Sequence, residues 1–167
     1  EIRVDGKTER LSGALPRFAA TSEGCEALAE TAARTDGGIS VNSKVKFEYD
    51  GFFWSDVRLD QVDGKVVEQM TLVIPLKDAE VPLFHAVSNT IRSNPGGAVP
   101  QGEGEVWNGA KLRRPTDSIH SQLVPYIWLG GIERGLCYFT DSSYGYKLQK
   151  DRGALRLVRR DGVLRVE

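Results

Sequence analysis

The chain has 167 residues, 40% of them hydrophobic and 27% charged, which is ordinary for a globular domain that buries a core. Its 22 basic and 23 acidic residues give a net charge of −1, so the bulk charge offers no attraction to nucleic acid or to an anionic membrane. No apolar run approaches the roughly 20 residues that a membrane helix needs. We therefore expect one domain over residues 1–167, with neither nucleic acid nor membrane among its partners.

Both ends of the sequence are strand-like, since residues 1–4 read EIRV and residues 163–167 read VLRVE. We therefore expect the chain to be a piece of a larger, multidomain protein. The localisation of that parent protein is not given by these residues.

Most of the chain shows the pattern of short antiparallel strands. Apolar and polar residues alternate from residue 39 onward, which is typical of half-buried strands. Asp-Gly pairs, which favour tight hairpin turns, begin at Asp5, Asp50, Asp63 and Asp161. No alternation of strands with helices is visible. These features predict an all-β fold, and more specifically an antiparallel β-sandwich.

Two segments interrupt this pattern. Residues 22–35 have the propensity of a helix, but the same letters also alternate, and the surrounding β pattern favours a strand. Residues 87–104 carry glycine and proline with almost no periodicity, which predicts a long loop.

Cys25 and Cys137 are the only cysteines, and they lie too far apart in the sequence to form a metal motif. A disulfide between them and two free, buried thiols both remain open, and free thiols are the simpler interpretation.

The densest aromatic run is residues 125–146, PYIWLGGIERGLCYFTDSSYGY. Tyr126 and Trp128 alternate with Ile127 and Leu129, so we expect a strand with an aromatic face and an aliphatic face. The glycine pair at 130–131 breaks the run, and a second strand follows the exposed Glu-Arg tip. The run therefore predicts an aromatic hairpin followed by a polar loop.

This hairpin resembles a segment of bacterial glycoside hydrolase-like proteins related to glycoside hydrolase family 123. Upstream, EYDGFF at 48–53 and LVIPLKDAEVPLFH at 72–85 resemble two further segments of that family, in the same order. The likeness covers residues 44–167. Tyr138 and Tyr146 stand where the family carries tryptophan, so a stacking surface there would be smaller.

The resemblance implies a supersandwich-like β-sandwich similar to galactose-mutarotase-type domains. It also implies an accessory role, in which the chain supports a carbohydrate-binding cleft made with a catalytic barrel domain of the same polypeptide. The parent would then be a glycoside hydrolase that is secreted, periplasmic or at the cell surface. A self-sufficient carbohydrate-binding module and a purely structural interdomain scaffold are the alternatives.

Aromatic rings stack on the apolar faces of sugars, and an arginine fork suits a diol or a carboxylate. The alternatives are a core position for Trp128 and a solvated turn for the Glu-Arg tip. The residues that we expect to contact carbohydrate or a neighbouring domain are Trp107, Tyr126, Trp128, Glu133, Arg134, Asp141, Tyr144 and Tyr146.

We expect no catalytic residue in this chain. A glycosidase needs two carboxylates about 5–10 Å apart, and no spacing here selects such a pair. The Asp-Glu dipeptide of family 123 is absent, and the chain is too short for a barrel of about 250 residues. We also expect neither metal nor cofactor, although calcium at Asp141 remains open.

Overall fold

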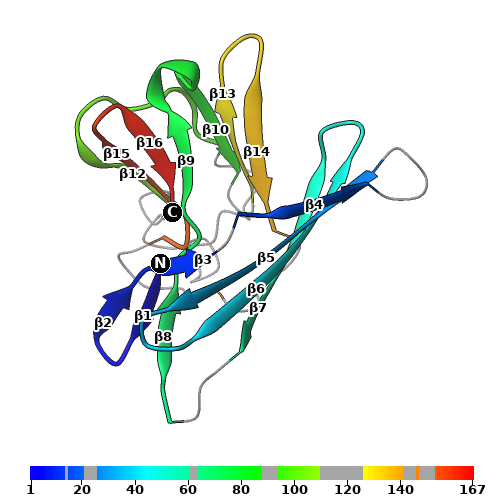
Figure 1. The fold of residues 1–167 in the computed structure, drawn as a ribbon. Helices are drawn as coiled ribbons and strands as arrows, with labels where there is room; N and C mark the ends of the chain where they lie inside the picture. Colours follow the sequence, from blue (N-terminus) through cyan, green and yellow to red (C-terminus); the bar gives the residue numbers. More distant parts are fainter. Residues whose placement is uncertain are drawn as a thin grey trace. The chain divides into compact units, whose positions relative to one another are not determined.

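A computed structural model describes residues 1–13, 15–20, 26–60, 64–87, 94–109, 126–140, 146 and 153–167 (Figure 1). In these residues the secondary structure is antiparallel strand apart from the short 3-10 helix η1 (Asp78–Glu80), so the all-β prediction is confirmed. The chain divides into two compact units, Glu1–Thr71 and Leu72–Glu167, where the sequence led us to expect one domain. No helix in the described residues is long and apolar enough to cross a membrane.

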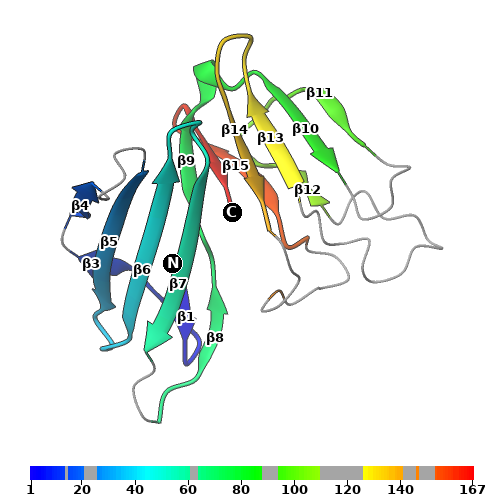
Figure 2. The same cartoon turned by 90° about the vertical axis from the view of Figure 1, so that its right-hand side faces the viewer.

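The first unit holds two sheets. Figure 2 shows strands β5, β6 and β7 of the larger sheet side by side. The smaller sheet has the order β2-β1-β8, and the larger has the order β3-β5-β6-β7, with β4 also paired to β5. The strands are β1 (Ile2–Val4), β2 (Lys7–Glu9), β3 (Leu11–Gly13), β4 (Arg17–Ala20), β5 (Glu26–Thr35), β6 (Ser40–Glu48), β7 (Phe53–Asp60) and β8 (Val67–Met70).

The segment with mixed helix and strand signals is strand β5 from Glu26 to Thr35, so the strand interpretation is confirmed there. It pairs continuously with β6, from Glu26 opposite Glu48 to Arg34 opposite Ser40. Residues 22–25, which include Cys25, lie outside the described residues. The core of this unit is formed by Ile2, Val4, Ile39 and Val41, with Leu11, Leu59 and Val67 packed against it.

Two of the predicted Asp-Gly turns are two-residue hairpins. Asp5 and Gly6 join β1 to β2 with φ angles of 46° and 78°, and Asp161 and Gly162 join β15 (Arg156–Arg160) to β16 (Val163–Val166) with 52° and 75°. Two consecutive positive φ angles are the signature of a type I′ turn, whose twist matches that of the strands. At the predicted Asp50-Gly51 turn, the Asp50 carboxylate accepts a hydrogen bond from the Phe52 amide.

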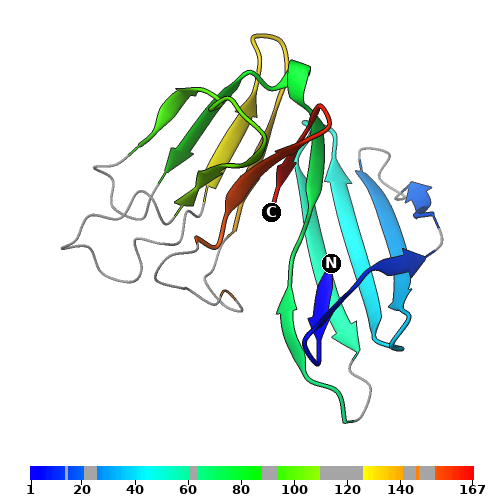
Figure 3. The same cartoon turned by 90° about the vertical axis from the view of Figure 1, so that its left-hand side faces the viewer.

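The second unit also holds two sheets, of order β11-β10-β13-β14 and β12-β15-β16-β9. Figure 3 shows β16, in red, beside the green β9. The strands are β9 (Ile74–Lys77), β10 (Leu83–Val87), β11 (Gly96–Ala98), β12 (Gly104–Asn108), β13 (Tyr126–Gly130), β14 (Gly135–Phe139), β15 (Arg156–Arg160) and β16 (Val163–Val166).

The two sheets of the second unit share one core. The β11-β10-β13-β14 sheet contributes Phe84, Ile127 and Leu129, and the other sheet contributes Trp107 and Leu157. The Phe84 and Trp107 rings meet with their centroids 5.9 Å apart. In β9, β10, β13 and β16 alternate residues therefore pack into this core, as the period of the sequence requires.

The predicted loop over residues 87–104 contains strand β11, which pairs with β10. The expectation of a structureless loop is therefore wrong for 96–98, and residues 88–93 lie outside the described residues. The stretch after β11 is held by the buried Arg159, which donates to the carbonyls of Pro100 and Gly102 at 2.7 and 2.9 Å. Its Nε lies 2.9 Å from Asp78 Oδ1, so the buried guanidinium is paired.

Candidate functional site

Strand β13 has the two faces that its alternation predicts. Ile127 and Leu129 are buried, whereas Tyr126 and Trp128 are only partly covered on the opposite side. The aliphatic residues belong to the shared core, so the aromatic pair lies on the outer face of the β11-β10-β13-β14 sheet. This places Trp128 outside the core.

The register brings further side chains to the same outer face. His85 on β10 and Cys137 on β14 both lie opposite Trp128, and Phe139 lies opposite Tyr126. His85, Cys137 and Phe139 are exposed. We call the residues His85, Tyr126, Trp128, Cys137 and Phe139 the aromatic face.

Two glycines make room for the Trp128 indole. A Cβ at Gly135 would lie 2.6 Å from Trp128 Nε1 and 2.8 Å from Cε2. At Gly130 a Cβ would lie 2.7 Å from Trp128 Cζ2. The indole therefore lies across this pair of glycines, which are opposite each other in the ladder, and any side chain there would displace it. An aromatic ring laid over sheet glycines is held in one orientation and leaves its outer side partly uncovered.

His85 is accommodated in a similar way on the neighbouring strand. A Cβ at Gly96, which lies opposite His85 on β11, would be 3.3 Å from His85 Cδ2. The imidazole also meets the Tyr126 ring nearly edge-on, with the centroids 6.2 Å apart and the planes at 70°. The rings of His85, Tyr126 and Trp128 thus lie on one outer face, where His85 packs edge-on against Tyr126 and Trp128 lies over the two glycines.

Tyr126 and Cys137 supply polar groups at the side of this surface. The hydrogen bond between their side chains, together with partial burial, raises the pKa of the Tyr126 phenol. Cys137 is a free and exposed cysteine, so the interpretation as a buried thiol is wrong for this residue. The phenol therefore remains neutral, and able to donate, at physiological pH.

The hairpin tip is solvent-exposed. The Gly131 amide donates to the Arg134 carbonyl at 2.9 Å and closes the turn, and Ile132 and Glu133 extend into solvent. Arg134 Nη1 lies 3.8 Å from Glu80 Oε2 on η1, with most of its side chain exposed. Exposed ion pairs of this kind contribute little to stability, so Glu133 and Arg134 remain accessible.

Other predicted contact residues lie elsewhere. Trp107 is only 7% exposed and packs in the core, because the strand that carries it turns this position inward. The Tyr146 hydroxyl is 2.5 Å from that of Tyr138, whose ring packs against the core. Neither residue joins the aromatic face. Tyr144 and Asp141, the residue for which calcium is an alternative, lie outside the described residues.

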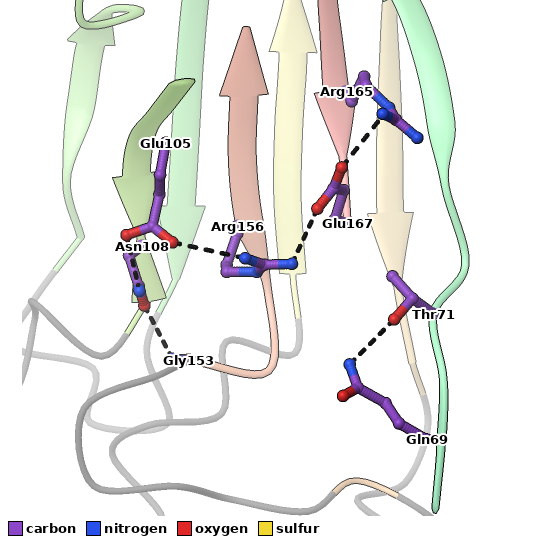
Figure 4. Close-up of polar contacts among 8 residues, drawn as sticks. All are labelled: Gln69, Thr71, Glu105, Asn108, Gly153, Arg156, Arg165 and Glu167. Carbon is purple, nitrogen blue, oxygen red and sulfur yellow. Dashed lines mark hydrogen bonds and ion pairs between the residues drawn. The ribbon is translucent and has the colours of Figure 1, made fainter. Parts of the chain in front are cut away.

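The opposite sheet of this unit carries a row of charges (Figure 4). Arg156 lies 2.8 Å from Glu167 Oε2 and 3.6 Å from Glu105 Oε2, and Arg165 lies 3.5 Å from Glu167 Oε1. Asn108 donates to Glu105 at 3.0 Å. We call Glu105, Arg156, Arg165 and Glu167 the charged row. Each carboxylate is engaged by an arginine, which is the arrangement of a structural network rather than of an acid and base pair.

The described residues contain no group of three or more His, Cys, Asp or Glu side chains arranged to hold a metal ion. Sequence reasoning missed His85, Cys137 and Phe139 as members of the aromatic face. Only strand register could have revealed them, because His85 is distant from the hairpin in sequence and joins it through the pairing of β10 with β13.

Comparison of the chain with protein-family models, with curated proteins and with solved structures finds no match.

Proposed function

We propose that the second unit binds carbohydrate through the aromatic face, as an accessory domain of a larger glycoside hydrolase-like protein. The observation that carries the proposal is the Trp128 indole, held flat on the sheet by Gly130 and Gly135 with its outer side partly uncovered. A flat, immobile ring suits the apolar C–H face of a pyranose, and it loses little conformational freedom on binding.

The groups around the indole suit a neutral sugar. His85 and the Tyr126 hydroxyl can donate to and accept from sugar hydroxyls at one side of the ring. The aromatic face contains no carboxylate, arginine or lysine, so it offers no fixed charge to an ionic ligand. Glu133 and Arg134, at the exposed hairpin tip, are placed to meet a longer glycan or an adjoining domain.

The accessory role rests on the resemblance of residues 44–167 to the family 123-related proteins. In this proposal the two sheets of the second unit, which share one core, make a β-sandwich of the supersandwich type. A catalytic barrel domain of the same polypeptide is the partner, and it supplies the acid and base. The charged row, whose carboxylates are paired, is consistent with a chain that leaves catalysis to that partner.

The test is binding of the 167-residue chain to a panel of neutral oligosaccharides, followed by calorimetry on any that bind. We expect Trp128→Ala to weaken binding at least about tenfold, because a central stacking ring carries most of such an interface. Trp54→Ala is the matched control, since Trp54 is a partly exposed tryptophan on β7 of the other unit. Binding that survives Trp128→Ala, or no binding to any glycan, would contradict the proposal and favour an interdomain scaffold.

A further inference from the structure

Strand β7 forms an open edge of the larger sheet in the first unit. It has eight residues, and within the described residues no strand pairs with the side that faces away from β6. The other strands at described sheet edges are three to five residues long. Long, regular edges offer a template for pairing, and β7 lacks the proline, lysine and bulge that usually block it.

The ladder with β6 shows which backbone groups of β7 face outward. The Glu48 amide donates to the Phe52 carbonyl at 2.8 Å, so this pair is hydrogen-bonded. Hydrogen-bonded and non-hydrogen-bonded pairs alternate along an antiparallel ladder, and the register runs without a shift to Ser40 opposite Asp60. The amide and carbonyl groups of Phe53, Ser55, Val57 and Leu59 therefore point to the open edge.

The side chains of β7 divide between the two faces of the sheet. Phe53 and Val57, each 45% exposed, lie on one face, and Trp54, Asp56 and Arg58 lie on the other. Arg58 Nε is 2.9 Å from Asp60 Oδ1, but its side chain is largely exposed, so this ion pair is weak and can be exchanged. An edge with adjacent exposed acidic and basic side chains on one face can complement a copy of itself.

We propose that two copies of this chain associate by antiparallel pairing of their β7 strands, centred on Val57. In this register Asp56 of each copy lies opposite Arg58 of the other, and the two Val57 residues meet on the opposite face. In this register odd-numbered residues of one copy lie opposite odd-numbered residues of the other. The outward amides of Ser55 and Val57 can therefore donate to carbonyl groups across the symmetry axis. A two-fold axis makes every such contact occur twice.

Neighbouring registers are less favourable. Centring the pair on Asp56 places the two Asp56 carboxylates directly opposite each other, and centring it on Arg58 does the same for the guanidinium groups. Like charges directly opposite each other destabilise a sheet. Centring it on Ser55 sets Asp56 against Trp54 and shortens the ladder. The charge pattern therefore selects Val57 as the centre.

Light scattering of the 167-residue chain after size exclusion tests the proposal. We expect the wild type to reach twice the mass of one chain as its concentration rises. Asp56→Arg and Arg58→Asp should each weaken association about ten- to hundredfold, since each replaces two attractive cross-strand pairs by two repulsive ones. Ser55→Pro should have a similar effect, because it removes an amide that faces the open edge without touching the β6 ladder.

The decisive measurement mixes the two charge variants. Asp56→Arg alone and Arg58→Asp alone repel themselves, but together they form two opposite-charge pairs, so the mixture should regain the double mass. Arg160→Glu, on the exposed end of β15 in the other unit, is the matched charge reversal away from the edge and should leave the mass unchanged. A wild type that stays at single mass, as it would if another segment covered β7, overturns the proposal. So does a mixture that fails to associate while both variants keep the wild-type melting temperature.

Discussion

The two sheets of the second unit carry different kinds of side chain on their outer faces. The aromatic face presents rings that lie over glycines and a few polar groups at their side. The charged row presents arginines and glutamates that already satisfy one another. Both faces are rich in residues that commonly mark functional sites, so residue type alone does not separate them.

The difference lies in what the side chains leave unsatisfied. Arg156 sits between two carboxylates, with only 18% of its side chain exposed, so a ligand would have to displace a partner that is already in place. The Trp128 indole has its ring plane covered on one side by glycines and partly uncovered on the other. Partly exposed apolar surface that cannot relax is what a ligand gains most from covering.

The largest effect is expected from a substitution that fills the space beneath the Trp128 indole. Gly135→Ala puts a Cβ 2.6 Å from Trp128 Nε1 and 2.9 Å from the Leu129 carbonyl, so the ring or the strand must move. We expect the free energy of unfolding to fall by about 1–3 kcal/mol, the usual cost of overpacking, and glycan binding to be lost. Chemical denaturation and the binding assay measure the two effects.

The control for this change is Gly131→Ala on the same turn. Its Cβ would lie 3.6 Å from the Glu80 carbonyl oxygen and 3.8 Å from Pro82 Cδ, which are ordinary contacts, so stability and binding should both stay near the wild type. The double variant Trp128→Ala with Gly135→Ala should recover part of the lost stability, because the indole is one of the colliding groups. Equal losses in the single and double variants would show that the indole does not lie over Gly135.

A substitution that disrupts the charged row should lower stability without changing glycan binding. Arg156→Ala leaves Glu105 and Glu167 without their shared guanidinium, and we expect a loss of about 1–2 kcal/mol of stability, since these groups are only partly buried. Glycan affinity should not change. Arg160→Ala, on the same strand but exposed, is the matched control. A drop in affinity for Arg156→Ala at unchanged stability would move the candidate site to this sheet.

How far the sequence predicts the molecule depends on the range of the interactions involved. The Asp5-Gly6 and Asp161-Gly162 hairpins and the two faces of β13 follow from local rules, because turn chemistry and a period of two act over a few residues. The division into two units does not follow from them, since it depends on which strands share a core.

Trp107 and Trp128 show the same limit at the level of the site. Both stand in strands, and nothing next to either one in sequence says which side of its sheet faces the core. The ladder between β12 and β15 shifts its register between Glu105 and Trp107, and the Trp107 ring lies in the core. An irregularity of this kind changes which side chains face inward, and it is invisible to an alternating pattern.

The smallest expected effect is a pH dependence of stability that arises from Tyr138, on the inner face of β14. Burial, and then the hydrogen bond between its hydroxyl and that of Tyr146, raise the pKa of Tyr138, which packs against the core. The unfolded chain ionises this phenol near pH 10, whereas the folded chain keeps it neutral. Its contribution to stability is therefore complete below about pH 10 and is lost progressively as the pH rises above that value.

Tyr138→Phe should remove this part of the alkaline decline in stability while costing about 0.5–1.5 kcal/mol at neutral pH for the lost hydrogen bond. Tyr146→Phe should shrink the decline without removing it, because burial is the larger cause of the raised pKa. Urea titrations between pH 7 and about 11 would measure both, and that range brackets the ordinary tyrosine pKa. An unchanged alkaline decline in Tyr138→Phe would mean that this phenol is accessible to water, and that β14 does not turn Tyr138 toward the core and Cys137 away from it.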